Sequence, residues 1–128
     1  MTYLLDTHTF LWLSAEPEKL SPTVREIVTR RKNRLLLSAA SGWELALLWQ
    51  LGRVELPQPP ARFIPEALQA LGIMPRPIGF QVAINAATLP LIHRDPFDRL
   101  LVAEALQENL PLLTKDATLA RYKVATIW

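Results

Sequence analysis

The sequence predicts an α/β fold in which a short parallel sheet is covered by helices on both faces. Short apolar segments alternate with longer segments of helical periodicity along the whole chain. The short segments are apolar throughout instead of alternating in polarity, which is typical of strands buried on both faces. The chain has 128 residues and neither an internal repeat nor a long linker, so residues 1–128 are predicted to form a single domain.

Five strands are expected where apolar residues form short uninterrupted runs. In chain order they are Thr2–Leu5, Arg34–Ser38, Met74–Ile78, Leu112–Thr114 and Val124–Ile127. The third of these segments contains Pro75 and Pro77, which have no backbone N–H to donate. We therefore expect this strand at an edge of the sheet.

Helices are expected where apolar residues recur at helical spacing between a capping residue and a terminating residue. In chain order they are Thr7–Ala15, Ser21 to about Lys32, Ser41–Leu51, Arg62–Leu71, Phe80–Thr88, Pro96–Asn109 and Ala117–Tyr122. Ser21 is a suitable N-cap, and Pro22 suits the first helical position. Gly52 and Gly72 are typical of helix C-termini, and Pro90 closes the fifth helix.

The composition excludes several classes of function. The chain has no cysteine, so disulfides, iron–sulfur clusters, cysteine zinc sites and cysteine nucleophiles are ruled out, and a cytoplasmic location is expected. No apolar run approaches the roughly 18–20 residues of a membrane span, and the N-terminus lacks a signal-peptide pattern, so no membrane contact is expected. The four glycines are scattered, which argues against a phosphate-binding loop, and there is no G-x-S-x-G motif.

Basic residues give only weak evidence for a nucleic-acid ligand. The formal net charge is +2, but ten of the fourteen basic residues are arginine, whose planar group suits phosphate and carboxylate recognition. The densest basic run comprises Arg30, Arg31, Lys32 and Arg34. This run is interpreted as a solvated helix end in preference to a phosphate-binding patch.

The chain has only four aspartates, and each lies where chemistry could use it. Asp6 and Asp116 directly follow predicted strands. Because ligands of parallel α/β sheets bind beyond the carboxyl ends of the strands, this architecture would bring the two together. Asp95 and Asp98 flank Pro96-Phe97 at the start of a helix, and Glu44 lies within an apolar helical segment.

Each of these acids has an alternative role as a helix cap. Asp95 precedes a proline at the first helical position, so it is the strongest capping candidate. Asp6 and Asp116 each precede a helix and could cap it while also serving a site. The segment Ser41-Gly42-Trp43-Glu44 has the spacing of a capping box, which leaves the role of Glu44 open between cap and ligand.

Several carboxylates in one cleft indicate a divalent cation. They repel one another and raise one another's pKa unless a cation compensates. Mg²⁺ or Mn²⁺ prefers such oxygen ligands, whereas zinc prefers nitrogen and sulfur. The only histidines, His8 and His93, are interpreted as satisfied or exposed side chains instead of ligands. A hydrated divalent site suits hydrolysis of a phosphodiester.

Four motifs give the chain a family resemblance along essentially its whole length. They are Tyr3-Leu4-Leu5-Asp6-Thr7-His8, Ser38-Ala39-Ala40-Ser41-Gly42-Trp43-Glu44, His93-Arg94-Asp95-Pro96-Phe97-Asp98-Arg99-Leu100-Leu101 and Leu113-Thr114-Lys115-Asp116. In these motifs the chain resembles PIN-domain nucleases and, among them, VapC-type toxins. The resemblance maps four acids onto the catalytic and metal-binding quartet of that family: Asp6, Glu44, Asp98 and Asp116. It leaves three supporting residues: Asp95, Thr114 and Thr7.

The resemblance implies a Rossmann-like α/β/α sandwich with a short central parallel sheet. It also implies an endoribonuclease, dependent on Mg²⁺ or Mn²⁺, that hydrolyses RNA phosphodiesters with a metal-activated water as the toxin of a toxin–antitoxin module. A homodimer and a small antitoxin, whose C-terminal segment blocks the acidic cleft from an apolar groove, are implied as partners. DNA would be contacted only indirectly, through the antitoxin. The chain has no distinct basic platform, so RNA binding is expected to use Arg94 and Arg99.

Two other functions stay open from the sequence. The first is a catalytically weak PIN-fold interaction module, which the apolar helix residues Trp12, Trp43 and Trp49 would serve, although core packing is the preferred interpretation of each. The second is a housekeeping nuclease of RNA processing with the same acidic site.

Overall fold

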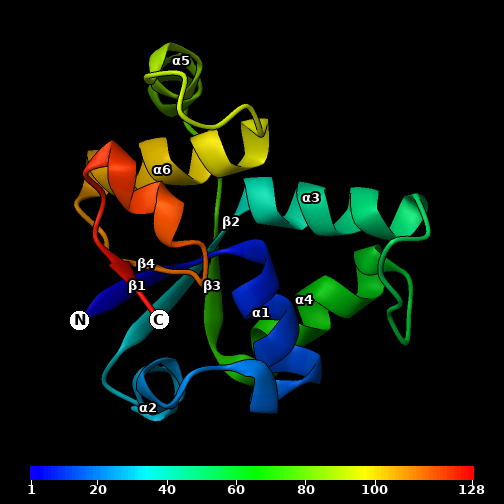
Figure 1. The fold of residues 1–128 in the computed structure, drawn as a ribbon. Coiled ribbons are helices and arrows are strands. Elements are labelled where there is room, and N and C mark those ends of the chain that lie inside the picture. The colour runs from blue at the N-terminus through cyan, green and yellow to red at the C-terminus, as the bar shows by residue number, and fades with distance from the viewer.

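A computed structural model of the protein describes all residues from 1 to 128, and its centre is a five-stranded parallel sheet (Figure 1). The strands follow the order β3-β2-β1-β4-β5 across the sheet. Their bounds are β1 Thr2–Leu5, β2 Arg34–Ser38, β3 Ile73–Arg76, β4 Leu112–Leu113 and β5 Thr126–Ile127. β3 lies at one edge, as predicted, although it spans Ile73–Arg76 instead of Met74–Ile78 and so contains Pro75 but not Pro77.

Helices cover both faces of the sheet, so the predicted α/β/α class is confirmed. The α-helices are α1 Thr7–Ala15, α2 Pro22–Thr29, α3 Ala39–Gln50, α4 Pro60–Leu71, α5 Phe80–Thr88 and α6 Pro96–Glu108. Two short 3₁₀ helices are η1 Pro17–Lys19 and η2 Ala117–Tyr122. In Figure 1, α1, α2 and α4 lie on one side of the sheet, and α6 and η2 lie on the other, with α5 outside α6.

The alternation of side chains along the strands creates one core on each face. Leu4 and its register partner Leu36 pack with α6 and η2. Leu5 and its partner Leu37 point the other way and pack with α1, α2 and α3. Since both faces are covered, the consecutive buried residues Tyr3–Leu5 of β1 and Leu35–Leu37 of β2 are all apolar, and burial of one leucine contributes about 1.5–3 kcal/mol.

Several helix ends differ from the sequence prediction. α2 ends at Thr29 instead of about Lys32, because Arg30 adopts an extended conformation and the basic run turns into β2. α3 begins at Ala39 instead of residue 41, because the side chain of Ser38, the last residue of β2, accepts a hydrogen bond from Ala40 N. α4 begins two residues early with a proline at its first position, and η1 was not predicted.

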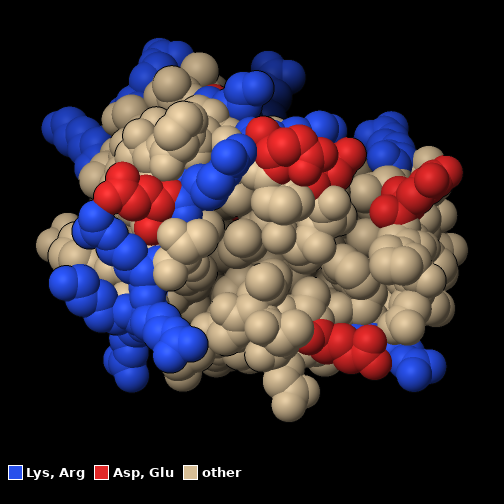
Figure 2. Space-filling model, turned by 90° about the horizontal axis from the view of Figure 1, so that it is seen from below, with Lys and Arg blue, Asp and Glu red and all other residues tan.

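The basic run lies at the amino-terminal edge of the sheet, where the chain enters β2. In Figure 2, Lys and Arg side chains gather on the left of the face, the side on which Figure 1 places α2. The run lies where the parallel strands begin, whereas the acids that follow β1 and β4 lie where the strands end, so the two are remote from each other. None of the helices combines the length and apolar composition needed to cross a bilayer.

One carboxylate is buried in the helix that covers the β1–β2 face. Glu104 of α6 is 3% exposed, and neither of its carboxylate oxygens has a hydrogen-bond partner of normal geometry. Burial raises the pKa of Glu104, and the nearby Ser38 hydroxyl and Arg76 guanidinium lower it only in part. The folded state therefore binds a proton at Glu104 more readily than the unfolded chain does.

Replacement of this carboxyl by the neutral amide is expected to stabilise the protein at alkaline pH. The folded-state pKa lies above the unfolded value, so the stability contributed by the protonated acid is lost as pH rises above about 4.5 through the folded pKa. Glu104→Gln should therefore gain about 1–3 kcal/mol over wild type at pH 8 and much less at pH 4.5. Urea unfolding at both pH values measures the difference. Glu66→Gln, on exposed α4, is the control, and equal effects of Glu104→Gln at both pH values would contradict the assignment.

Candidate active site

The predicted acids meet in one cavity at the carboxyl ends of β1 and β4. The cavity has a volume of about 200 Å³ and no apolar side chain in its lining. Its seven lining residues are Asp6, Thr7, His8, Glu44, Asp95, Asp98 and Asp116. All four acids of the predicted quartet thus lie together, although they are separated by up to 110 positions in the sequence.

Asp6 connects β1 to α1, caps that helix and also lines the acidic cavity. Its Oδ1 accepts a hydrogen bond from Thr9 N at 2.9 Å, which caps α1. Its Oδ2 accepts a hydrogen bond from Thr114 Oγ1 at 2.5 Å. The capping contact and the threonine together fix the carboxylate at the cavity wall.

Thr114 links the two acids that follow neighbouring strands. It is 1% exposed, and besides donating to Asp6 its hydroxyl oxygen accepts a hydrogen bond from Asp116 N at 3.1 Å. Asp116 also caps η2, because its Oδ1 accepts from Thr118 N at 3.0 Å. Thr114 therefore has the supporting position that was predicted for it.

The capping-box interpretation of Glu44 is wrong. Ser38 caps α3, so Glu44 lies in the second turn of the helix and cannot reach the cap amide. Instead, its Oε1 accepts a hydrogen bond from Thr7 Oγ1 at 2.5 Å. Burial raises the pKa of Glu44, and Asp95 and Asp6 add to the rise, while Thr7 and His8 oppose it.

Asp95 and Asp98 lie at the start of α6 and have different roles. Asp95 Oδ1 accepts hydrogen bonds from Phe97 N at 2.8 Å and from Asp98 N at 3.4 Å, so it is the helix cap that was predicted. Burial raises the pKa of Asp98 to about 7, and the negative charges of Asp95, Glu44, Asp6 and Asp116 add to the rise. Asp98 is thus the acid whose pKa is raised by the charges of all four others.

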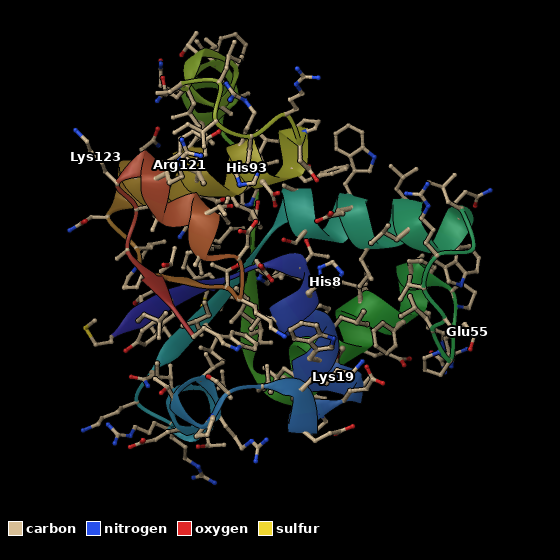
Figure 3. The ribbon with its side chains drawn as sticks, in the orientation of Figure 1. His8, Lys19, Glu55, His93, Arg121 and Lys123 are labelled. Carbon is tan, nitrogen blue, oxygen red and sulfur yellow. The ribbon has the colours of Figure 1, made fainter.

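His93 is a site residue that the sequence interpretation missed. Its Nε2 lies 2.6 Å from Thr118 Oγ1 and 3.7 Å from Asp116 Oδ2. One potential ligand atom from each of His93, Asp98 and Asp116 lies within 4.8 Å of the other two. His8 lines the same cavity from α1, and Figure 3 labels both histidines. The signal available in the sequence was the position of His93 five residues before Asp98.

Arg99 is placed away from the cavity, which corrects its assignment to RNA binding. It is 7% exposed, and its guanidinium donates to five acceptors, most of them in the segment between α5 and α6. These are the carbonyl oxygens of Ala87, Leu89, Pro90 and His93 and the hydroxyl of Tyr122. Both terminal nitrogens of this buried guanidinium are thus directed at groups of the protein and not at the acidic cavity. Arg94, by contrast, is exposed and stays a candidate.

The donor set fits a hard divalent cation. Carboxylates dominate the cavity wall, and no Lys or Arg lines it to neutralise them. Burial and the neighbouring acids both raise the pKa values of Asp98 and Glu44, and a bound cation would favour their ionised forms. Oxygen ligands with one nitrogen nearby suit Mg²⁺ or Mn²⁺ better than zinc.

The fold and the site together define a class: a parallel α/β/α domain that has a carboxylate-lined cavity at the carboxyl ends of its strands and no phosphate-binding loop. This chain belongs to the PIN domain family, whose model matches residues 3–125. It is 34% identical over 134 residues to Ribonuclease VapC22 of Mycobacterium tuberculosis, covering 99% of this chain and 98% of the relative. Ribonuclease VapC16 of the same organism is 41% identical over 51 residues, which are 40% of this chain and 36% of the relative. The resemblance to VapC-type PIN proteins is confirmed.

Solved structures of two complexes contain the same fold. VapBC2 from Rickettsia felis, bound to a DNA fragment from its promoter, matches with a TM-score of 0.72 at 15% identity, covering 99% of this chain and 98% of the other. FitAcB from Neisseria gonorrhoeae matches with a TM-score of 0.64 at 23% identity, covering 100% and 97%. At these identities the two structures support the fold.

Proposed function

We propose that the protein is an endoribonuclease that depends on Mg²⁺ or Mn²⁺ and is the toxin of a toxin–antitoxin pair. The observation that carries the proposal is the cavity in which Asp98 lies among four other acids, where burial and the charges of those acids raise its pKa to about 7. The substrate class is supported by the full-length relative, which is named a ribonuclease. Pairing with an antitoxin is supported by the fold shared with VapBC2 and FitAcB.

The proposed ligands of the cation are Asp6, Glu44, Asp98 and Asp116, with His93 at the Asp116 side. When bound, such a cation supplies positive charge to the phosphoryl oxygens and acidifies water for hydrolysis. Thr114 and Thr7 donate hydrogen bonds to the first two acids and so orient their carboxylates before the substrate arrives. Arg94, exposed at the rim, is proposed to contact an RNA phosphate.

The proposed antitoxin site is a second cavity of about 390 Å³ beside the acids. Leu47, Leu51 and Phe97 line it, and it shares Glu44 and Asp95 with the acidic cavity. A helical peptide with an apolar face would fit the leucines, and a basic residue on it could reach the shared carboxylates. A partner bound in this way would close the acidic cavity. Contact with DNA is proposed to occur only through this partner.

A homodimer is proposed on the outer side of α5. Phe80 is 85% exposed and Ile84 45%, and Leu91 in the following loop is 90% exposed. Large apolar side chains so exposed are typical of association surfaces. A second copy of the chain is the proposed occupant.

The purified protein is expected to cleave single-stranded RNA with Mg²⁺ or Mn²⁺, to stop when EDTA is added, and to resume with excess cation. Gel electrophoresis of end-labelled RNA measures the products, and single-stranded DNA of the same sequence is the control for substrate class. Cleavage that persists in EDTA would contradict the dependence on a cation. Absence of RNA cleavage under all cation conditions would contradict the proposed activity.

A further inference from the structure

Two tryptophans and two lysines form a cluster beside α1 that has no part in the site described above. Both tryptophans are partly exposed and pack with one side against the core. The rings of Trp12 and Trp128 meet edge to face with their centroids 5.7 Å apart. The ammonium groups of Lys115 and Lys19 lie 5.9 Å and 6.0 Å from the centroid of Trp12. These four residues are termed the Trp12 cluster.

The Trp12 cluster is continuous with the acidic cavity along two segments of the chain. On α1, His8 lines the cavity and lies one turn before Trp12, with the two ring centroids 5.8 Å apart. After β4, Lys115 immediately precedes Asp116 of the cavity. Figure 3 shows His8 on α1 and Lys19 on η1, which follows α1 in the chain. The cluster therefore begins where the acidic cavity ends.

The two lysines of the cluster differ in their availability to a ligand. Lys19 forms an ion pair with Glu16 at 2.8 Å. Lys115 is exposed and has no carboxylate oxygen within 4.0 Å, although five acidic side chains line the adjacent cavity. An unpaired ammonium group held against an indole ring beside an acidic cavity can bind a phosphate that the acids themselves would repel.

We propose that the Trp12 cluster binds the single-stranded RNA on one side of the phosphate that is cleaved. Lys115 binds a backbone phosphate, and Trp128 with Trp12 provides the aromatic surface for an adjacent base. Aromatic stacking combined with a cation is the usual way to bind unpaired nucleotides without reading their sequence. The inference rests on the proposed function and names the part of the surface that holds its substrate.

RNA binding by the full chain carrying Asp98→Asn, with Mg²⁺ present, separates binding from cleavage. Anisotropy of a fluorescent single-stranded oligoribonucleotide is measured over a range of salt concentrations. Adding Lys115→Gln is expected to weaken binding and to reduce the slope of log affinity against log salt by about 0.7, the value for one phosphate contact. Lys115→Arg should keep the slope. Lys32→Gln, which removes an exposed lysine at the opposite edge of the sheet, is the matched control and should change neither quantity.

The aromatic part of the cluster has a separate test. Trp128→Leu in the same background is expected to weaken binding about 5- to 150-fold, the range for loss of one stacked base, without a change in the salt slope. Trp49→Leu, at the far end of α3, is the matched control. Thermal unfolding of each variant establishes that it is folded. If Trp128→Leu does not fold, the Lys115 variants still test the proposal.

The outcomes separate this inference from the proposed function. An unchanged salt slope in Lys115→Gln would overturn the Trp12 cluster as the RNA site while RNA cleavage by wild type stands. Equal affinity for a duplex of the same RNA would overturn it too, because paired bases are not free to stack. If wild type cleaves no RNA and the Asp98→Asn parent binds none, both proposals are overturned.

Discussion

Asp98→Asn is expected to lower the rate of RNA cleavage by on the order of 10²- to 10³-fold, the cost of removing one charge-stabilising group from a catalytic site. Asp98 is the acid on which the fields of Asp95, Glu44, Asp6 and Asp116 converge. The neutral amide has nearly the same shape but removes a charge that a divalent cation needs. Initial rates with an end-labelled oligoribonucleotide measure the loss.

The control for this variant lies on the same helix. Glu108→Gln changes an acid at the far end of α6 that is paired with Arg76, and it should leave the cleavage rate unchanged. A rate within threefold of wild type for Asp98→Asn would remove this residue from the proposed mechanism. Loss of activity in both variants would indicate a general defect of α6 instead.

The pH dependence of cation binding gives the same variant a second signature. Because the pKa of Asp98 is about 7, a proton competes with the cation below that pH. The apparent dissociation constant for Mn²⁺ should therefore rise about tenfold per unit as pH falls below 7, and Asp98→Asn should weaken this dependence, leaving the part that comes from Glu44, whose pKa burial also raises. The sign is opposite for stability: the contribution of the protonated acid is present below pH 3.8, its ordinary pKa, and is lost as pH rises through about 7.

The positions of Asp6 and Asp116 were predictable because strand ends can be read from the local sequence, and because parallel strands all end on the same side of a sheet. Asp6 and Asp116 follow apolar runs, and in a parallel sheet such runs end at one edge. The hydrogen bond from Thr114 to Asp6 joins residues 108 positions apart, but it follows directly from β4 lying beside β1. Sequence pattern and topology were therefore sufficient to bring Asp6 and Asp116 together, whereas the choice of Glu44 and Asp98 as the other two acids came from the family resemblance.

Other features depended on packing that no local pattern reveals. The spacing of Ser41 and Glu44 matched a capping box, but β2 runs directly into α3 and places the cap three residues earlier. His93 was set aside because isolated histidines are seldom ligands, whereas the loop before α6 places it beside Asp116. Arg99 was assigned to RNA because the chain lacks a distinct basic platform, but its guanidinium is buried against the segment between α5 and α6.

Arg99→Leu is expected to lower the free energy of unfolding by about 3–5 kcal/mol, which is large for a chain of this length. The substitution removes five hydrogen bonds and leaves carbonyl oxygens between α5 and α6 without partners, among them those of Leu89 and His93. Urea unfolding measures the loss. Arg94→Leu, an exposed arginine in the same segment, should change stability by less than about 0.5 kcal/mol.

The Arg99 guanidinium does not offset the negative charge of the acidic cavity. Arg99 adjoins Asp98 in sequence, yet the pKa of Asp98 is set by burial and by other acids, because the Arg99 charge is directed at the α5–α6 segment. Arg99→Lys keeps the charge but not the five-donor geometry, so it should recover less than half of the lost stability. If Arg99→Lys is as stable as wild type, a positive charge at this position is sufficient for stability. The hydrogen bonds of the guanidinium, including the one to the His93 carbonyl, are then not required.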